Sequence, residues 1–194
     1  MMMDLTLDDL DADWPTLWAL AERLGKLTGT GPDSAFFPLG LGLHGRQGSK
    51  RPYDVTPANS TTFASTGGDG VHFSLLHTTP PGTAPVVMTV PMQFDAPNHV
   101  IGGSLREFLA LGCYTGFYHL DRLAYDGGRQ AEASHLEHGR WEGTGWDGET
   151  PEAAALELLA ALTQGLGLAP WRDVPQRLAE LQASYLPPRT RDRA

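Results

Sequence analysis

Two periods of hydrophobic and polar residues run along this chain, and each predicts a different kind of element. Residues 71–76 alternate strictly between two sets of side chains, which predicts a strand with one face against a core. Residues 85–92 form a nearly continuous apolar run, which predicts a central strand covered on both faces. With a shorter strand at 99–101, these patterns predict a sheet over about residues 60–103.

Helical spacing flanks this β region on both sides. Apolar residues recur at intervals of three and four between Trp14 and Leu24, after acidic residues that suit a helix start. Ser104 and Glu107 have the spacing of a capping box, in which each side chain bonds the other residue's backbone amide. Two more helices are predicted in the C-terminal part, beginning near residues 150 and 173.

The predicted fold class is therefore α+β: one mixed, largely antiparallel sheet with helices packed from the N- and C-terminal segments. We expect a single domain over residues 1–187 and a flexible basic tail over 188–194. Residues 45–59 are polar and rich in turn formers, which predicts a surface loop. The glycine-rich segment 126–149 is expected to be a long loop or a lid.

Composition narrows the class of protein. The chain has 194 residues, of which 41% are hydrophobic and 19% charged, and it has no run of eighteen apolar residues, so we expect neither a membrane span nor wholesale disorder. A single cysteine excludes an intrachain disulfide framework. The N-terminus has no basic and apolar leader, which favours the cytoplasm. The abundance of Arg, Ala, Gly and Pro is typical of a GC-rich bacterial genome.

The charge balance indicates what kind of partner the protein attracts. Fourteen basic and 23 acidic residues give a formal net charge of −9. Such a protein repels nucleic-acid phosphates at long range and is drawn towards basic protein surfaces.

The glycine-rich sequence 67–70 invites a phosphate-binding interpretation. A phosphate-binding loop of the Walker type ends in Gly-Lys-Ser/Thr and enters a helix, whereas these glycines precede a strand and enclose Asp69. The sequence therefore predicts a tight turn here.

Histidines supply the candidate metal ligands. Glu132, His135 and His138 are spaced to share one helical face, but the glycines around them argue against a stable helix. His72 and His77 are an odd number of positions apart, so a strand would direct them to opposite faces. We expect no metal site and no cofactor.

Nucleophilic catalysis has one weak candidate. Cys113 is followed by His119 and Asp121, but proximity in sequence shows neither a nearby base nor a lowered thiol pKa. A lone cysteine more often packs as a small apolar group, so we expect no catalytic residue.

Two short stretches resemble the SUKH superfamily of bacterial proteins. One is the sequence Phe-Ala-Ser-Thr-Gly-Gly-Asp-Gly at 63–70 followed by a strand, and the other is Ser-Leu-Arg-Glu-Phe-Leu at 104–109. The resemblance covers about residues 60–112. It implies an α+β domain without catalytic residues, and a role as an immunity protein that binds and neutralises a toxin delivered by neighbouring bacteria.

We therefore expect a non-enzymatic, cytoplasmic bacterial protein that binds another protein, such as a basic toxin, and neither nucleic acid nor membrane. The expected contact residues are Asp54, Asp69, His72 and Trp146. This interpretation requires an exposed surface that is acidic and partly apolar.

Two alternatives stay open. The first is a small metal-dependent or hydrolytic enzyme that uses histidines within 72–77 or 119–138, which requires a deep pocket with at least two titratable groups. The second is a small-ligand-binding module that uses Trp141 and Trp146.

Overall fold

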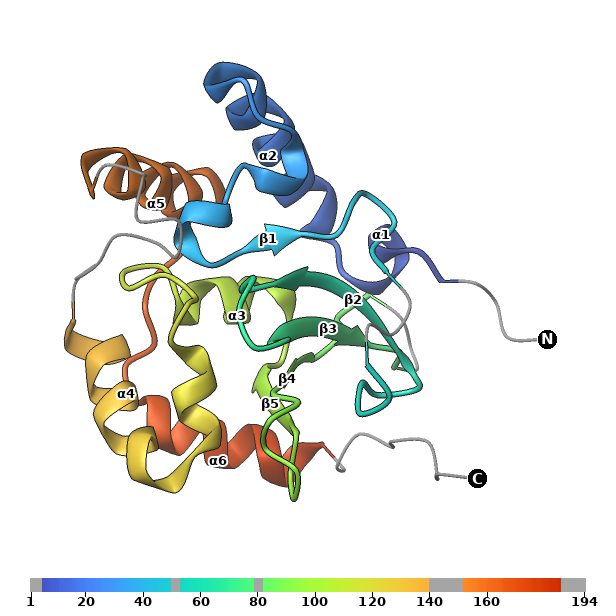
Figure 1. Ribbon diagram of the computed structural model, residues 1–194, viewed down its shortest axis with the longest axis vertical. Coiled ribbons are helices and arrows are strands. Elements are labelled where there is room, and N and C mark those ends of the chain that lie inside the picture. Colours follow the sequence, from blue (N-terminus) through green and yellow to red (C-terminus); the bar gives the residue numbers. More distant parts are fainter. Residues whose placement is uncertain (1–4, 50–52, 79–81, 140–151, 186–194) are drawn as a thin grey trace.

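Five antiparallel strands form one sheet in sequential order, and helices pack around it in the computed structural model, which confirms the α+β class (Figure 1). The structure describes residues 5–49, 53–78, 82–139 and 152–185. The strands are β1 (Gly42–Leu43), β2 (Ser60–Ser65), β3 (His72–Leu76), β4 (Val86–Thr89) and β5 (Asn98–Gly102). Four of the five lie in the predicted range, and β1 extends the sheet beyond it.

The helices come from both terminal parts of the chain and from the segment after the sheet. They are α1 (Leu7–Leu10), α2 (Trp14–Thr28), α3 (Leu105–Leu111), α4 (Asp126–His138), α5 (Glu152–Leu166) and α6 (Val174–Ser184), with short 3₁₀ helices η1 (Pro32–Ser34), η2 (Phe37–Leu39) and η3 (Leu120–Ala124). In Figure 1, α2 and α5 lie above the sheet, α3 lies to the left of β2 and β3, α4 lies at the lower left and α6 at the bottom. The predicted helices correspond to α2, α3, α5 and α6.

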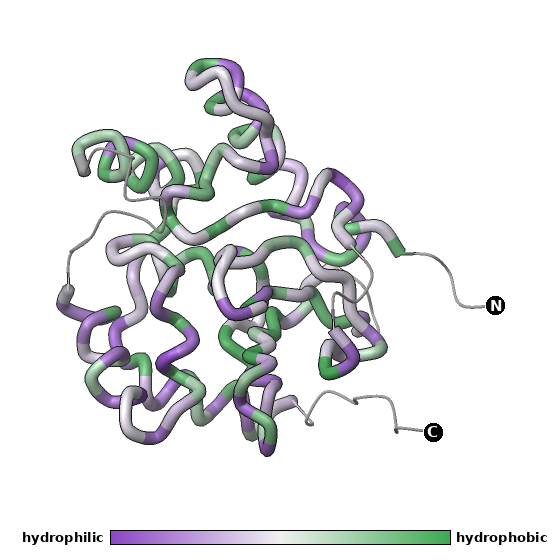
Figure 2. The backbone as a smooth tube through the Cα atoms, in the orientation of Figure 1, coloured by the Kyte–Doolittle hydropathy of each residue, from purple (hydrophilic) through white to green (hydrophobic). Residues whose placement is uncertain are grey.

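One face of the sheet packs on an aromatic core. Phe63 on β2 and Phe73 on β3 contact Phe108 of α3, with ring centroids 5.7 and 4.7 Å from that of Phe108. Trp14 of α2 packs its ring against Phe63 at 6.0 Å. The hydrophobic stretches of the strands and of α5 in Figure 2 belong to this interior. Because aromatic side chains bury the most area, this face provides most of the hydrophobic stabilisation.

The other face of the sheet is buried as well, which corrects the expectation that β3 has only one buried face. The described parts of the segment expected to be a surface loop, 45–49 and 53–59, form hydrogen bonds with this part of the sheet. Thr56 bonds His72 across this contact at 2.9 Å. Within the sheet, the Thr62 and Ser74 hydroxyls bond each other at 2.9 Å. Polar residues can be buried here because their hydrogen bonds are made inside the protein.

The start of α3 differs in one detail from the predicted capping box. The Ser104 hydroxyl accepts a hydrogen bond from the Glu107 amide, as predicted. The Glu107 carboxylate does not return to Ser104: it accepts from the Gly103 amide at 2.6 Å and pairs with Arg177 of α6. The competing partner is a cation from a distant helix, which the local spacing could not reveal.

Residues 126–138 correct the prediction of a long loop, because they form the helix α4. Its two glycines, Gly127 and Gly128, lie in the first turn of the helix. The amides of a first turn make no hydrogen bond inside the helix, whatever the sequence, so glycine interrupts none there. Ala133 and Leu136 are buried, and α4 packs against η3 and α6. Tertiary packing thus outweighs the low helix propensity of glycine.

Asp11 joins the N-terminal part of the chain to the start of α3. Its buried carboxylate accepts hydrogen bonds from the Leu105 amide at 2.9 Å and from the Asp13 amide at 2.9 Å. Burial raises the pKa of Asp11, while these two amides oppose the rise.

Candidate functional site

A turn with unusual backbone geometry joins β2 to β3. Gly67 and Gly70 have φ values of 85° and 70°, and Asp69 between them has a φ of 49°. Aspartate is among the few non-glycine residues that tolerate this left-handed region, and glycine adopts it freely. The sequence 67–70 therefore forms the tight turn that was predicted, with the exposed Asp69 at its tip.

Four paired residues mark the end of the sheet from which this turn leaves. Ser65, His72, Thr89 and Asn98 stand in one row across β2, β3, β4 and β5. Since β2 and β4 end at this row and β3 and β5 begin at it, the β2–β3 turn and the β4–β5 loop project from the same end.

His72 lies under this end of the sheet and joins two loops. It is 1% exposed, and its Nδ1 lies 2.7 Å from the Gly70 carbonyl oxygen, which can only accept a hydrogen bond. Burial lowers the pKa of His72, which favours the neutral ring. Nδ1 therefore carries the proton, and Nε2 accepts from the Thr56 hydroxyl at 2.9 Å.

Tyr53 packs on the outer side of His72. The two rings are stacked, with centroids 5.6 Å apart and an interplanar angle of 14°. The Tyr53 hydroxyl also touches Gly70: a Cβ at that position would lie 2.6 Å from it. The Asn98 side-chain amide donates to the Val55 carbonyl at 2.9 Å and so fixes the same segment to β5. These contacts bring the exposed Asp54 to the end of the sheet where Asp69 lies.

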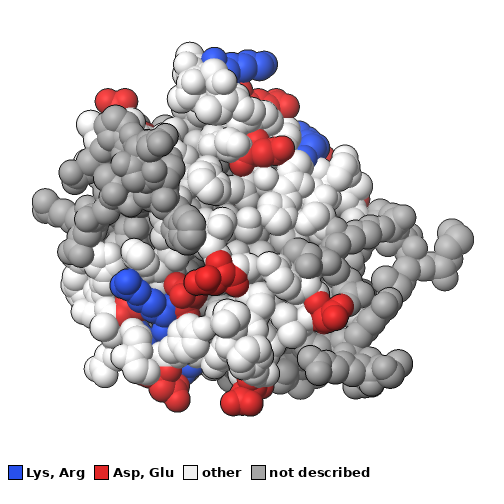
Figure 3. All heavy atoms as spheres, viewed as in Figure 1, with Lys and Arg blue, Asp and Glu red and all other residues white. Residues whose placement is uncertain are grey.

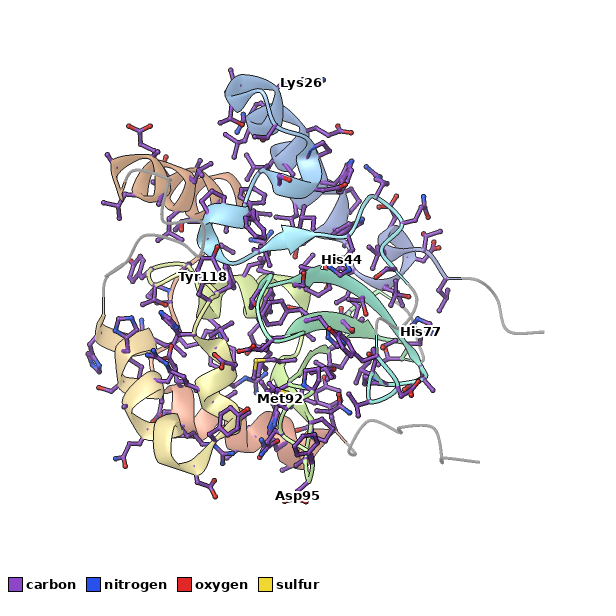
Figure 4. The ribbon with its side chains drawn as sticks, viewed as in Figure 1. Lys26, His44, His77, Met92, Asp95 and Tyr118 are labelled. Atoms are coloured by element: carbon purple, nitrogen blue, oxygen red, sulfur yellow. The ribbon has the colours of Figure 1, made fainter. Side chains whose placement is uncertain are left out.

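The β4–β5 loop adds large apolar side chains to this end. Phe94 is 83% exposed and Met92 is 60% exposed, and the exposed Asp95 lies next to Phe94. Figure 4 shows Met92 and Asp95 on this loop, with Asp95 at its tip. Gln93 holds the loop in place, since it donates to the Ala124 carbonyl and bonds His99, both at 2.9 Å.

Together these residues form what we term the acidic–aromatic surface, made of Tyr53, Asp54, Asp69, Met92, Phe94 and Asp95. The three segments that carry it, 53–57, 66–71 and 90–97, contain no lysine or arginine. Figure 3 shows red acidic side chains at several places on the lower half of the face that it draws, with blue basic side chains at the lower left. The surface therefore combines negative potential with exposed apolar area, which is typical of a protein-binding site.

Of the four expected contact residues, two are exposed, one is buried and one lies outside the described residues. Asp54 and Asp69, 15 positions apart in the sequence, are exposed and belong to one surface. His72 is buried, so its side chain cannot touch a partner in this structure and instead supports Tyr53. Trp146 lies outside the described residues, as does Trp141.

Sequence reasoning missed Tyr53, Met92 and Phe94. A signal for two of them was present: Met92 and Phe94 lie between Pro91 and Pro97, in a segment where a hairpin loop is expected to be polar. Large apolar side chains in such a loop cannot all be buried. For Tyr53 the sequence holds no comparable signal, because its position depends on the packing of a loop against His72.

A second group of ionisable residues gathers where η3 meets α4. Burial raises the pKa of Asp121 and of Glu132, whose side chain is only 4% exposed, and His135 opposes the rise at Glu132. Arg122 lies 3.6 Å from the Glu132 carboxylate. Burial also lowers the pKa of His119, which interacts with Asp121 and His135. This cluster contains Glu132 and His135 of the metal candidate on α4, and His119 and Asp121 of the nucleophile candidate.

The cluster does not have the geometry of a metal centre. Among the described residues, no three His, Cys, Asp or Glu side chains are placed to hold a metal ion together. His138, the third member of the predicted helical face, is exposed, and its Nδ1 lies 3.7 Å from the neighbouring Glu137. His72 and His77 bond separately to Thr56 and Thr61.

Cys113 has the environment of an apolar group. It is buried, and burial raises the pKa of its thiol to about 11. A thiol with this pKa is a poor nucleophile at neutral pH because almost none of it is ionised.

Comparisons with other proteins do not assign a function to this chain. No known protein family, curated protein or solved structure matches this chain. None of the described helices is both long enough and apolar enough to cross a membrane.

Proposed function

We propose that this chain is a non-enzymatic bacterial protein of the cytoplasm that binds a basic protein through the acidic–aromatic surface. The observation that carries the proposal is the exposure of Phe94 and Met92 at the end of the sheet where the exposed Asp54, Asp69 and Asp95 also lie. Exposed aromatic side chains supply binding energy once a partner covers them, and the carboxylates steer a basic partner towards them.

The more specific form of the proposal is a toxin-immunity protein resembling the SUKH superfamily. The two stretches that resemble this superfamily include the β2–β3 turn, which carries Asp69, and the start of α3. An acidic protein that covers a basic face of a toxic nuclease would exclude its nucleic-acid substrate, because both occupy the same positive surface.

The proposal predicts that a gene beside this protein's gene encodes a toxin domain, and the test uses that domain. We expect the wild-type protein to bind the purified toxin and to restore growth of cells that express it. Asp54→Lys/Asp69→Lys and Phe94→Ala should each weaken the complex by at least tenfold, as measured by calorimetry, because the first reverses charge and the second removes an anchor.

Glu157→Lys on α5 is the matched control, since Glu157 is also exposed and belongs to none of the three segments. It should bind as the wild type does. A complex that tolerates both surface variants, or loses as much affinity with the control, would rule out this surface as the binding site.

The ionisable cluster supports a second candidate, an enzyme that uses acid–base chemistry. Two carboxyl groups with raised pKa values beside two histidines are a common arrangement in active sites. If this is correct, Glu132→Gln should abolish turnover in a screen of hydrolase substrates while leaving toxin binding unchanged. An absence of turnover in the wild-type protein would eliminate this candidate.

A further inference from the structure

We propose that the outer face of Tyr53 binds the guanidinium group of an arginine side chain, with Asp54 and Asp69 as flanking carboxylates. This inference rests on the proposed function and names the chemical group that the acidic–aromatic surface recognises.

The Tyr53 ring is held rigidly from behind. His72 stacks on one face of the ring at a centroid distance of 5.6 Å, and the glycine at position 70 leaves room for the hydroxyl. The backbone around the ring is fixed too, because the Tyr53 amide donates to the Thr56 hydroxyl and the Thr56 amide donates to the Tyr53 carbonyl. Tyr53 as a whole residue is nevertheless 45% exposed. One aromatic face is therefore covered by the protein while the side chain as a whole still faces solvent.

Two acidic residues are next in sequence to the ring or to the residue that it touches. Asp54 is the next residue in the chain, and Asp69 precedes the glycine that the Tyr53 hydroxyl touches. Both aspartates are exposed, and within the described segments neither one forms an ion pair or a side-chain hydrogen bond. They are therefore available to accept hydrogen bonds from a cation above the ring.

Arginine fits this arrangement better than lysine. A guanidinium group is planar and weakly hydrated, so it can lie flat on an aromatic ring while its edge donates to carboxylates on either side. An ammonium group is compact and strongly hydrated, and it gains mainly from the charge. The acidic residues alone would not distinguish the two cations, so the preference for arginine depends on the ring.

The test is a titration followed by NMR with the peptide acetyl-Gly-Arg-Gly-amide and its lysine analogue. We expect millimolar binding that shifts the amide signals of Asp54 and Asp69, with the arginine peptide bound about threefold more tightly than the lysine peptide. Tyr53→Leu should bring the two affinities together, whereas Tyr53→Phe, which keeps the ring, should preserve the preference.

Tyr114→Leu is the matched control, because Tyr114 is 47% exposed and belongs to a different part of the chain. It should keep the preference for arginine. Equal affinity of the wild-type protein for the two peptides would overturn the guanidinium site, whether or not Tyr53→Leu folds. In that case, weaker binding of both peptides to Asp54→Asn/Asp69→Asn would still support the acidic surface of the proposed function, because it would show that the two carboxylates attract cations. Failure of both peptides to bind would overturn the site as well, and the toxin complex would decide the proposed function separately.

Discussion

The two faces of the sheet are both buried, yet they are built from different chemistry. One face buries Phe63 and Phe73 against Phe108. The other buries His72 and Ser74 at β3, which we term the polar face, and packs Val87 and Val100 against Leu181 of α6 further along the sheet. The first face gains stability from apolar area, which needs no specific direction. The polar part of the second face depends on directional hydrogen bonds, which fix the positions of the segments that bind it. The comparison teaches that the apolar face holds the fold together, while the polar face positions the candidate binding surface.

The largest effect should come from the apolar face. We expect Phe73→Ala to lower the free energy of unfolding by about 3–5 kcal/mol, because it removes a buried aromatic ring and leaves a cavity. Urea denaturation measures the change. Phe73→Leu, which keeps most of the volume, should cost much less. If Phe73→Ala lowered the free energy of unfolding by less than a variant of the polar face, the apolar face would not be the main source of stability.

On the polar face, the buried hydroxyls of Thr62 and Ser74 are each other's hydrogen-bond partners, so removing one should cost stability by leaving the other without a partner. Thr62→Val should lower the free energy of unfolding by about 1–3 kcal/mol, since the buried Ser74 hydroxyl loses its partner. The double variant Thr62→Val/Ser74→Ala should recover most of this loss. A double-mutant cycle by urea denaturation gives the coupling, and strictly additive effects would contradict it.

Acid should destabilise the folded protein, and the histidines of the polar face, His44 and His72, should contribute to this loss together with His99 and His119. Burial lowers the pKa values of His44 and His72 in the folded protein, so the unfolded chain binds more protons as the pH falls below about 6.5. Stability should therefore decrease from about pH 6.5 towards pH 5. Unfolding midpoints across this range, compared with those of His72→Gln, measure the change. A His72→Gln profile as steep as that of the wild type would exclude His72 as a source.

The smallest effect on stability should come from the surface that the polar face supports. Asp69→Asn should change the free energy of unfolding by less than about 0.5 kcal/mol, because Asp69 is exposed and asparagine also tolerates its positive φ. The same variant should weaken binding of a basic partner. Parallel measurements of thermal unfolding and affinity separate the two effects. A large drop in the unfolding midpoint would show that Asp69 has a structural role.

The sequence was informative where local pattern and tertiary packing agree. Strand β3 follows from the alternation of residues 71–76, and the turn before it follows from glycines at 67, 68 and 70. Helix α4 was missed because its stability comes from packing against η3 and α6. Local propensity could not supply that information.

The candidate surface was only half predictable, for a related reason. Asp54 and Asp69 were singled out because acidic residues in loops are visible in a sequence. That they share one surface depends on Tyr53 packing on Gly70 and His72, a long-range contact that no local pattern records. His72 was expected to touch a partner because an isolated strand does not reveal which loop covers its polar face.

The link from Asp11 to Leu105 has a consequence for how the protein can be shortened. The carboxylate that satisfies the first amide of α3 comes from a residue 94 positions earlier in the chain. A truncated protein that begins at α2 would retain every strand and still leave that amide buried without an acceptor. Residues 5–13 are therefore a structural element in their own right, and any minimal version of this domain has to include Asp11.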